Sequence, residues 1–390
     1  VQTDDPPLGS VVAARIPFAS TIRQVIRHRP GTRVVPVSRL LMGGQARLDA
    51  TAFAKVIGTL RMGSTPVAEG PHTQLLEAAR AAGRPLTDAE LLASPYLAFA
   101  RQIAVEWGNY FGATSDAELV ELARGLIDWG LGESSTRLTK TSGSKEGDGV
   151  LVAKVSGSDA YQVMDGHHRV AVATLRGETH VRVQRTWLNA ETPLLWRLGA
   201  AARKARSLCQ PLPARELDAW RVERNCADRL VRMERFVRTL ADGPDERSYL
   251  DVGIGFGWFL AAFRARGWRV SGIATTEVSV DVATSFFDVA RSDLACGDAV
   301  ALLEGTTGTH GVVACLDVAA VLPEGRDGLA RLLSALDART GRVLFVEEPA
   351  DDPSLSRRAL AATRFAHATD LGVSADPDGT RPSRLVALTR

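Results

Sequence analysis

The stretch 249–277, YLDVGIGFGWFLAAFRARGWRVSGIATTE, decides the fold of the C-terminal part of this chain. An apolar run ending at Asp251 leads into glycines at positions 253, 255 and 257, and an amphipathic segment follows at 258–266. A second strand-like run occupies 269–273. The order predicts strand, glycine turn, helix and strand, which is the opening unit of a doubly wound nucleotide-binding domain. Glycines in the turn let the backbone come close to a ligand.

The glycine spacing is G-x-G-x-G and lacks the further G-x-x-G spacing of dinucleotide-binding folds. Further motifs follow in order: CGDA at 296–299, HGVVACLDVAAVLPE at 310–324, GRVLFVEEP at 341–349 and a terminal pair of strand-like runs. Together, over about 245–390, they resemble the class I S-adenosylmethionine-dependent methyltransferases. The resemblance implies an α/β fold, a Rossmann-like domain with a seven-stranded sheet, and S-adenosyl-L-methionine as cofactor.

The resemblance also implies roles for single residues. An acid at the end of the first strand faces the methionine amino group, the glycine turn lies under the ligand, and an acid after the third strand meets the adenine amine. The expected cofactor-binding residues are Asp251, Gly253, Ile254, Gly255, Phe256, Gly257, Trp258, Thr275, Glu277, Asp298, Ala299 and Asp317.

The chain departs from the family pattern at two places. Family members carry a carboxylate for the ribose hydroxyls where this chain has Ala274, so either Thr275 or Glu277 must replace it. The paired histidines that often follow strand four are Ala320 and Val321 here. A general base for a hydroxyl acceptor must therefore come from other carboxylates at the strand ends, where such sheets place their ligands. The candidates are Asp317, Glu347 and Glu348.

The N-terminal part contains a second set of motifs. VVPVSRL at 34–40 and VMDGHHRVAVATLRG at 163–177 resemble the ParB/sulfiredoxin-like α+β fold, whose strand–turn–helix contacts phosphate. The resemblance implies a phosphate site made by Asp165, Gly166, His167, His168 and Arg169. The alternative is that the histidines only cap a helix, in a domain kept for packing or substrate docking. No third ligand accompanies the two histidines at a telling spacing, so no metal site is predicted.

These patterns divide the chain into three parts. We expect a ParB/sulfiredoxin-like domain over 1–190 with a helical insertion at about 86–131, where Ser115 and Glu118 form a capping box. An arginine-rich helical connector or lid should occupy 191–243, and the methyltransferase domain 244–390.

Composition narrows the function classes. The net charge of the 390 residues is only +2, which gives no overall footprint for nucleic acid. No apolar run approaches the length of a membrane span, and the first ten residues lack the pattern of a secretory signal. The four cysteines are scattered, without a C-x-x-C pair. We therefore expect a cytoplasmic protein.

The leading functional hypothesis is O-methylation of a sugar, glycan or secondary-metabolite hydroxyl, because the two-part arrangement resembles methyltransferases of bacterial glycan and secondary-metabolite pathways. The N-terminal domain would then recognise a phosphate- or nucleotide-bearing group. Two alternatives stay open: a bifunctional nucleotide-dependent kinase or hydrolase with a methyltransferase-like domain, and a non-catalytic regulatory protein that binds the cofactor. The quaternary state is also open, with a homodimer as one option.

Overall fold

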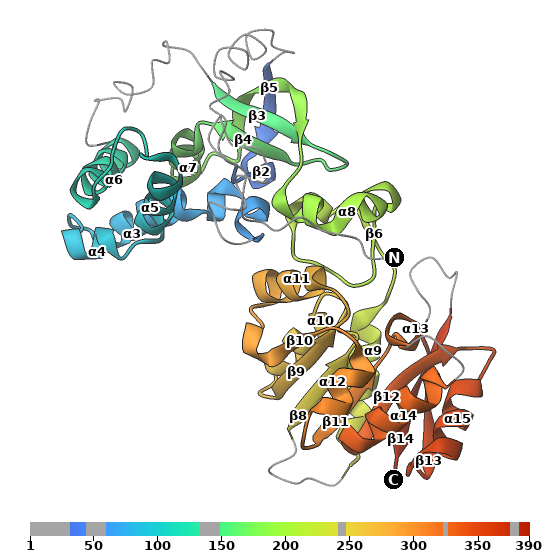
Figure 1. Ribbon diagram of the computed structural model, residues 1–390. Helices are drawn as coiled ribbons and strands as arrows, with labels where there is room; N and C mark the ends of the chain where they lie inside the picture. Colours follow the sequence, from blue (N-terminus) through green and yellow to red (C-terminus); the bar gives the residue numbers. More distant parts are fainter. Residues whose placement is uncertain (1–31, 44–59, 133–148, 241–246, 323–326, 375–381) are drawn as a thin grey trace.

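The computed structural model describes residues 32–43, 60–132, 149–240, 247–322, 327–374 and 382–390. They form an N-terminal α+β unit, a connector and a C-terminal α/β unit, arranged along the molecule in that order (Figure 1). A helix expected near residues 22–29 and a polar loop expected at 132–149 lie almost wholly outside the described residues.

The N-terminal unit is built on a mixed five-stranded sheet of order β1-β5-β3-β4-β2. Its strands are β1 (Thr32–Pro36), β2 (Leu40–Leu41), β3 (Val150–Val155), β4 (Tyr161–Asp165) and β5 (His180–Ala190). The strand expected at 34–41 is split, because a short 3-10 turn (Val37–Arg39) separates β1 from β2. The expected strand–turn–helix over DGHHR is present, with α7 (His167–Leu175) directly after β4.

Helices inserted between β2 and β3 share one apolar core with α7, which buries Tyr96, Phe99 and Tyr110. They are α3 (Pro71–Ala82), α4 (Asp88–Leu92), α5 (Pro95–Trp107) and α6 (Asp116–Leu131). The expected start of the insertion near residue 86 is therefore too late. The segment of α3 has its own helix signals, Pro71 in the first turn and Gly83 in the left-handed conformation at the end. The predicted capping box of Ser115 and Glu118 is confirmed at the start of α6.

The connector is less helical than its sequence pattern suggests. It contains α8 (Pro193–Ala205), the short paired strands β6 (Ser207–Leu208) and β7 (Arg221–Val222), and α9 (Cys226–Val237). The second helix begins only at Cys226, where the Asn225 side chain accepts a hydrogen bond from the backbone of Asp228.

The connector also joins the two units through a shared apolar cluster. Leu194, Leu195 and Trp220 of the connector pack in one cluster with Leu41 and Val155 of the N-terminal unit and with Val282 and Phe286 of the C-terminal unit. At the same place the buried Glu216 carboxylate accepts hydrogen bonds from the hydroxyls of Ser64 (2.6 Å) and Thr192 (2.7 Å). The arrangement fixes the connector against the N-terminal unit by apolar packing and by paired polar groups.

The C-terminal unit has a seven-stranded sheet of order β10-β9-β8-β11-β12-β14-β13, as predicted in strand number. Neighbouring strands are parallel except along β14, which runs antiparallel to both β12 and β13. The strands are β8 (Ser248–Val252), β9 (Arg269–Ala274), β10 (Leu294–Cys296), β11 (His310–Cys315), β12 (Thr340–Pro349), β13 (His367–Ser374) and β14 (Ser383–Thr389). This is a Rossmann-like open sheet closed by an antiparallel hairpin.

Helices cover both faces of this sheet (Figure 1). One face packs against α9, α10 (Trp258–Arg264) and α11 (Glu277–Phe287). The other packs against α12 (Ala299–Gly305), α14 (Gly328–Arg339) and α15 (Ser354–Ala362), and the short α13 (Val318–Val321) follows β11. Near-continuous apolar strands such as β8 and β11 are what burial on both faces requires.

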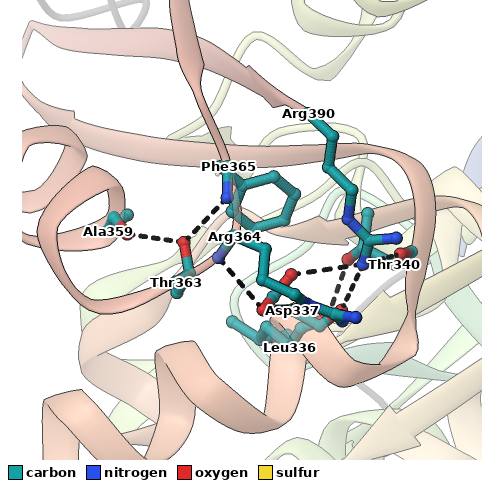
Figure 2. A network of polar contacts seen from close by, with 8 residues as sticks. All are labelled: Leu336, Asp337, Thr340, Ala359, Thr363, Arg364, Phe365 and Arg390. Atoms are coloured by element: carbon teal, nitrogen blue, oxygen red, sulfur yellow. Dashed lines mark hydrogen bonds and ion pairs between the residues drawn. The ribbon is translucent and has the colours of Figure 1, made fainter.

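A polar network holds the end of the chain to α14 (Figure 2). The buried Asp337 carboxylate accepts hydrogen bonds from the Arg364 guanidinium (2.9 Å) and from Arg390 (3.2 Å), which also donates to the carbonyl of Thr340 (2.7 Å). Burial alone would raise the pKa of Asp337, but the hydrogen bonds from Arg364 and Arg390 outweigh it and hold the pKa below its ordinary value. The closing hairpin is thus fixed by charge-assisted bonds as well as by its strand pairing.

Within the described residues, no helix combines the length and the apolar character needed to cross a bilayer.

Candidate functional site

The glycine turn after β8 lies at the carboxyl edge of the sheet, where open α/β sheets bind their ligands. All three glycines have positive φ. A side chain at Gly257 would begin 2.8 Å from the Cβ of Ala283, so glycine is needed here for the turn to pack against α11. A side chain at Gly255 would begin 2.7 Å from the amide of Gln210. The turn is therefore packed closely from two sides.

Gln210 reaches this turn from the connector. Its Oε1 accepts hydrogen bonds from the backbone N–H groups of Phe256 (2.9 Å) and Trp258 (3.3 Å). Because the N-cap residue of α10 is Gly257, which offers no side-chain cap, the Gln210 side chain supplies the acceptor for the first turn of this helix. The sequence analysis missed Gln210, which stands in the QPLP segment that interrupts the helical pattern of the connector.

Asp251 is a buried carboxylate at the end of β8, only 2 % exposed. Its Oδ2 atom has no hydrogen-bond partner among the described residues. Burial raises the pKa of Asp251 to about 7, and the Arg224 guanidinium partly opposes this shift. A buried carboxylate oxygen without a partner is costly unless a ligand donor meets it. This atom and the close-packed glycine turn fit the amino group and backbone cradle that the expected cofactor requires.

Arg224 and Asp317 form an ion pair at the same edge. The Arg224 Nη2 atom lies 2.8 Å from Asp317 Oδ2, and the Asp317 side chain also caps α13 by accepting from the backbone of Ala320. The Asp317 side chain is 37 % exposed. Burial raises the pKa of the neighbouring Cys209 thiol to about 11, so this thiol is neutral at pH 7. Arg224 is a second connector residue that the sequence analysis did not identify.

The residues expected around the ribose lie at the start of α11. The Thr276 hydroxyl caps this helix by accepting from the backbone of Ser279 (3.3 Å), while Thr275 is exposed. The Glu277 carboxylate is exposed and lies 3.7 Å from Arg291. Ala274 is fully buried. Thr275 and Glu277, the two expected replacements for the missing carboxylate, are therefore both open to solvent beside the end of β9.

The remaining expected cofactor residues differ in how far their side chains are exposed. Asp298 caps α12, with its Oδ1 atom 2.8 Å from the backbone nitrogen of Ala301. The side chains of Ile254 and Ala299 are buried in the two cores, so only their backbone atoms face the edge of the sheet. Trp258 is half-buried and packs edge-on against Phe259.

The expectation that Glu347 or Glu348 serves as general base is corrected by their contacts. The Glu348 carboxylate is buried and accepts hydrogen bonds from the backbone nitrogen (2.9 Å) and hydroxyl (3.1 Å) of Ser356 at the start of α15. The Glu347 side chain is 6 % exposed and forms an ion pair with Arg229, itself 1 % exposed. Both carboxylates hold helices to β12, and neither is open to an acceptor.

The same ion pair involves an arginine on the buried side of α9. Arg229 is buried with Leu230 and Met233, which belong to the core of the C-terminal sheet. Its guanidinium also donates to the hydroxyl of Ser383 (2.8 Å).

The two histidines of DGHHR lie inside the N-terminal unit, among aromatic rings of the helical insertion. His167 Nε2 accepts a hydrogen bond from the backbone of Gly43 (3.1 Å), and His168 Nε2 is bonded to the Tyr96 hydroxyl (3.0 Å). Burial lowers the pKa of His167 to about 4 and that of His168 to about 3. The rings of His167 and His168 are therefore engaged by Gly43 and Tyr96, and the phosphate site at this motif stays a prediction.

The other residues of that motif lie nearer the surface. Asp165 is exposed, and Gly166 takes the left-handed conformation at the start of α7. Arg169 lies 3.5 Å from the carbonyl of Gly149. Among the described residues, no group of three or more His, Cys, Asp or Glu side chains could hold a metal ion.

No protein-family model matches this chain, and no curated protein matches it. Among solved structures, the bifunctional kinase-methyltransferase WbdD is 19 % identical with a TM-score of 0.37, over 47 % of this chain and 43 % of WbdD. A SAM-dependent methyltransferase from Archaeoglobus fulgidus is 15 % identical with a TM-score of 0.31, over 42 % of this chain and 94 % of that protein. Magnesium protoporphyrin IX methyltransferase from Synechocystis PCC 6803 with bound SAH is 16 % identical with a TM-score of 0.33, over 42 % and 83 %. With TM-scores below 0.5, these likenesses do not establish the function of this chain.

Proposed function

We propose that the C-terminal unit is an S-adenosylmethionine-dependent methyltransferase. The observation that carries the proposal is Asp251, a buried carboxylate with an unpartnered oxygen, at the end of the first strand and directly before a close-packed glycine turn. The sheet order, with β14 antiparallel between β12 and β13, agrees with the fold that the sequence motifs imply. When bound, S-adenosylmethionine supplies a methyl group activated by its sulfonium.

The residues of this chain would bind and orient the cofactor. Asp251 accepts from the methionine ammonium, and the turn from Gly253 to Gly257 lies beneath the ligand. Glu277 and Thr275 would hold the ribose, and the second carboxylate oxygen of Asp298 would accept from the adenine amine. Holding the methyl group and the acceptor in line is the main catalytic task in such a transfer.

Asp317 is the one of the three expected catalytic carboxylates that stays partly exposed at this edge. We assign to Asp317 the role of general base, which accepts the proton of the acceptor hydroxyl, while Arg224 orients the carboxylate. Asp317 is the N-cap residue of α13 and pairs with Arg224, and these two contacts hold its carboxylate after the end of β11. The acceptor class, a sugar, glycan or secondary-metabolite hydroxyl, rests on the resemblance of the two-part chain. The N-terminal unit would then hold the acceptor.

Titration calorimetry with S-adenosylhomocysteine tests cofactor binding. We expect binding by the full chain, loss of about tenfold or more for Asp251→Asn, and no change for Asp351→Asn, which removes an exposed carboxylate beyond β12. No binding at millimolar concentration by a folded protein would refute the proposal.

Transfer itself is followed with a labelled methyl donor and a panel of free sugars, sugar phosphates and glycans. Asp317→Asn should abolish labelling while S-adenosylhomocysteine binding is retained. Binding without transfer to any acceptor would favour the non-catalytic alternative. Nucleotide turnover that is lost in Arg169→Ala would instead favour the bifunctional kinase or hydrolase.

A further inference from the structure

A cavity opens at the amino edge of the same sheet, opposite the edge with the glycine turn. Its volume is about 230 Å³. Arg247 directly precedes β8, Trp268 directly precedes β9, and Arg342 lies near the start of β12. The pairings Val312↔Tyr249 and Val312↔Val343 bring these strand starts to one edge. The cavity is therefore well separated from the proposed cofactor site at the carboxyl edge.

Most of the polar residues that line the cavity are basic. Four arginines and one acid contribute to it: Arg238, Arg247, Arg266, Arg342 and Glu234. Glu234 is already used, because it forms an ion pair with Arg266. Neither Arg238 nor Arg247 has an ion-pair partner within the described ranges, and both are exposed. Arg238 and Arg247 therefore add two exposed positive charges to the lining that Glu234 does not neutralise.

The remaining residues that line the cavity are apolar. Val237, Phe263 and Trp268 line it. Phe263 is buried, and the half-buried Trp268 packs edge-on against it with ring centroids 5.4 Å apart. A cavity with an apolar wall and a few converging charged groups is typical of a small-molecule site.

We propose that this cavity binds a phosphorylated small molecule whose ring or other apolar group rests against Trp268. A phosphate monoester carries close to two negative charges at neutral pH and presents several acceptor oxygens. The guanidinium group of an arginine can donate two parallel hydrogen bonds to such oxygens. A single carboxylate would supply only one negative charge for Arg238 and Arg247. The volume limits the ligand to a small molecule.

Phenyl phosphate is a suitable probe, because it joins a phosphate monoester to one ring. We expect calorimetry at fixed ionic strength to show saturable binding of phenyl phosphate, and weaker binding of inorganic phosphate and of phenol. Arg238→Ala and Arg247→Ala should each weaken phenyl phosphate binding by roughly tenfold. The matched control is Arg235→Ala, which removes an exposed arginine of α9 that does not line the cavity.

Three results would overturn the proposal. One is no binding of phenyl phosphate at millimolar concentration. Another is equal weakening by Arg235→Ala and Arg238→Ala, which would indicate a general charge effect. The third is binding of inorganic phosphate as tight as that of phenyl phosphate, which would show an adventitious anion only. Thermal melting confirms that each variant is folded, and saturating S-adenosylhomocysteine should leave the affinity unchanged. The outcome is thus independent of whether the methyltransferase proposal holds.

Discussion

The side-chain carbonyl of Gln210 accepts a hydrogen bond from the backbone N–H of Phe256 at 2.9 Å, in the middle of the glycine turn. Gln210 belongs to the connector and Phe256 to the C-terminal unit, so the conformation of the candidate cofactor turn depends on a residue outside its own domain. The φ of 57° at Gly255 is a backbone conformation that residues with a side chain rarely adopt, and the Gln210 amide lies 2.7 Å from its Cβ position.

Replacement of Gln210 should therefore affect both stability and ligand binding. We expect Gln210→Leu to lower the free energy of unfolding by about 1 kcal/mol, since two N–H groups at the start of α10 lose their acceptor. It should also weaken S-adenosylhomocysteine binding. Gln210→Glu keeps an acceptor oxygen and should recover most of the stability. Denaturant unfolding and calorimetry measure the two effects; equal stability of the Leu and Glu variants would contradict the capping role.

Ligand affinity should depend on pH through Asp251. With a pKa of about 7, this carboxyl is mostly protonated at pH 6 and mostly ionised at pH 8. An ammonium binds the ionised form, so affinity for S-adenosylhomocysteine should rise by roughly tenfold over this range. In Asp251→Asn only the titration of the ligand amine remains, and the pH dependence should shrink to that contribution. An identical pH profile in the variant would exclude Asp251 as the titrating group.

Ionisation of Asp251 should lower the stability of the unliganded protein as the pH rises. Because the folded-state pKa of Asp251 is raised above its unfolded value, ionisation opposes folding. The contribution of this group is present at low pH and is lost as pH rises through about 7. Above pH 7, Asp251→Asn should then be more stable than the parent chain, as thermal melting can show.

The buried pair of Arg229 and Glu347 should be essential for stability rather than for chemistry. Arg229→Met leaves a buried carboxylate without its cation and should cost about 3–5 kcal/mol. The double variant Arg229→Met with Glu347→Leu removes both charges and should recover most of this loss. Arg235→Met on the exposed face of α9 is the control. If Glu347→Gln abolished methyl transfer without changing stability, Glu347 would again be a candidate base.

The N-terminal unit should lose stability in mild acid because of His167. Its folded pKa of about 4 lies below the ordinary unfolded value near 6.5, so the unfolded state takes up protons first. The stability contribution is complete above about pH 6.5 and is lost as pH falls toward 4, with a loss on the order of 2 kcal/mol at pH 5 for this ring.

A neutral acceptor at this position separates titration from packing. His167→Gln can still accept from Gly43 and should melt with a smaller difference between pH 7.5 and pH 5 than the parent chain. His180→Gln, on the exposed part of β5, should leave that difference unchanged. A parent chain with the same melting temperature at both pH values would rule out the buried neutral histidine.

Local pattern was enough to predict the parts that depend on neighbours in sequence. The glycine turn, the strands on each side of it, the strand–turn–helix over DGHHR and the capping box of α6 all follow from short-range periodicity and turn chemistry. The seven strands of the C-terminal sheet were implied by the family resemblance of these motifs, and the structure has seven.

Side-chain availability was not predictable in the same way, because it depends on contacts between distant segments. Glu347 and Glu348 stand at a strand end, as expected, but Arg229 and Ser356 occupy them from other elements. The histidines of DGHHR begin a helix, as expected, but His167 is buried and the half-buried His168 is bonded to Tyr96 of the inserted helices.

The glycine turn and the acid before it could be predicted from a few neighbouring residues, because local backbone and strand rules govern both. Which groups stay open at the edge of the sheet depends on the packing of distant segments. This packing brought Gln210 and Arg224 from the connector to that edge and gathered the arginine cavity at the opposite one. Burial and ion pairing act between residues far apart in the chain, and a linear pattern contains no record of such distances.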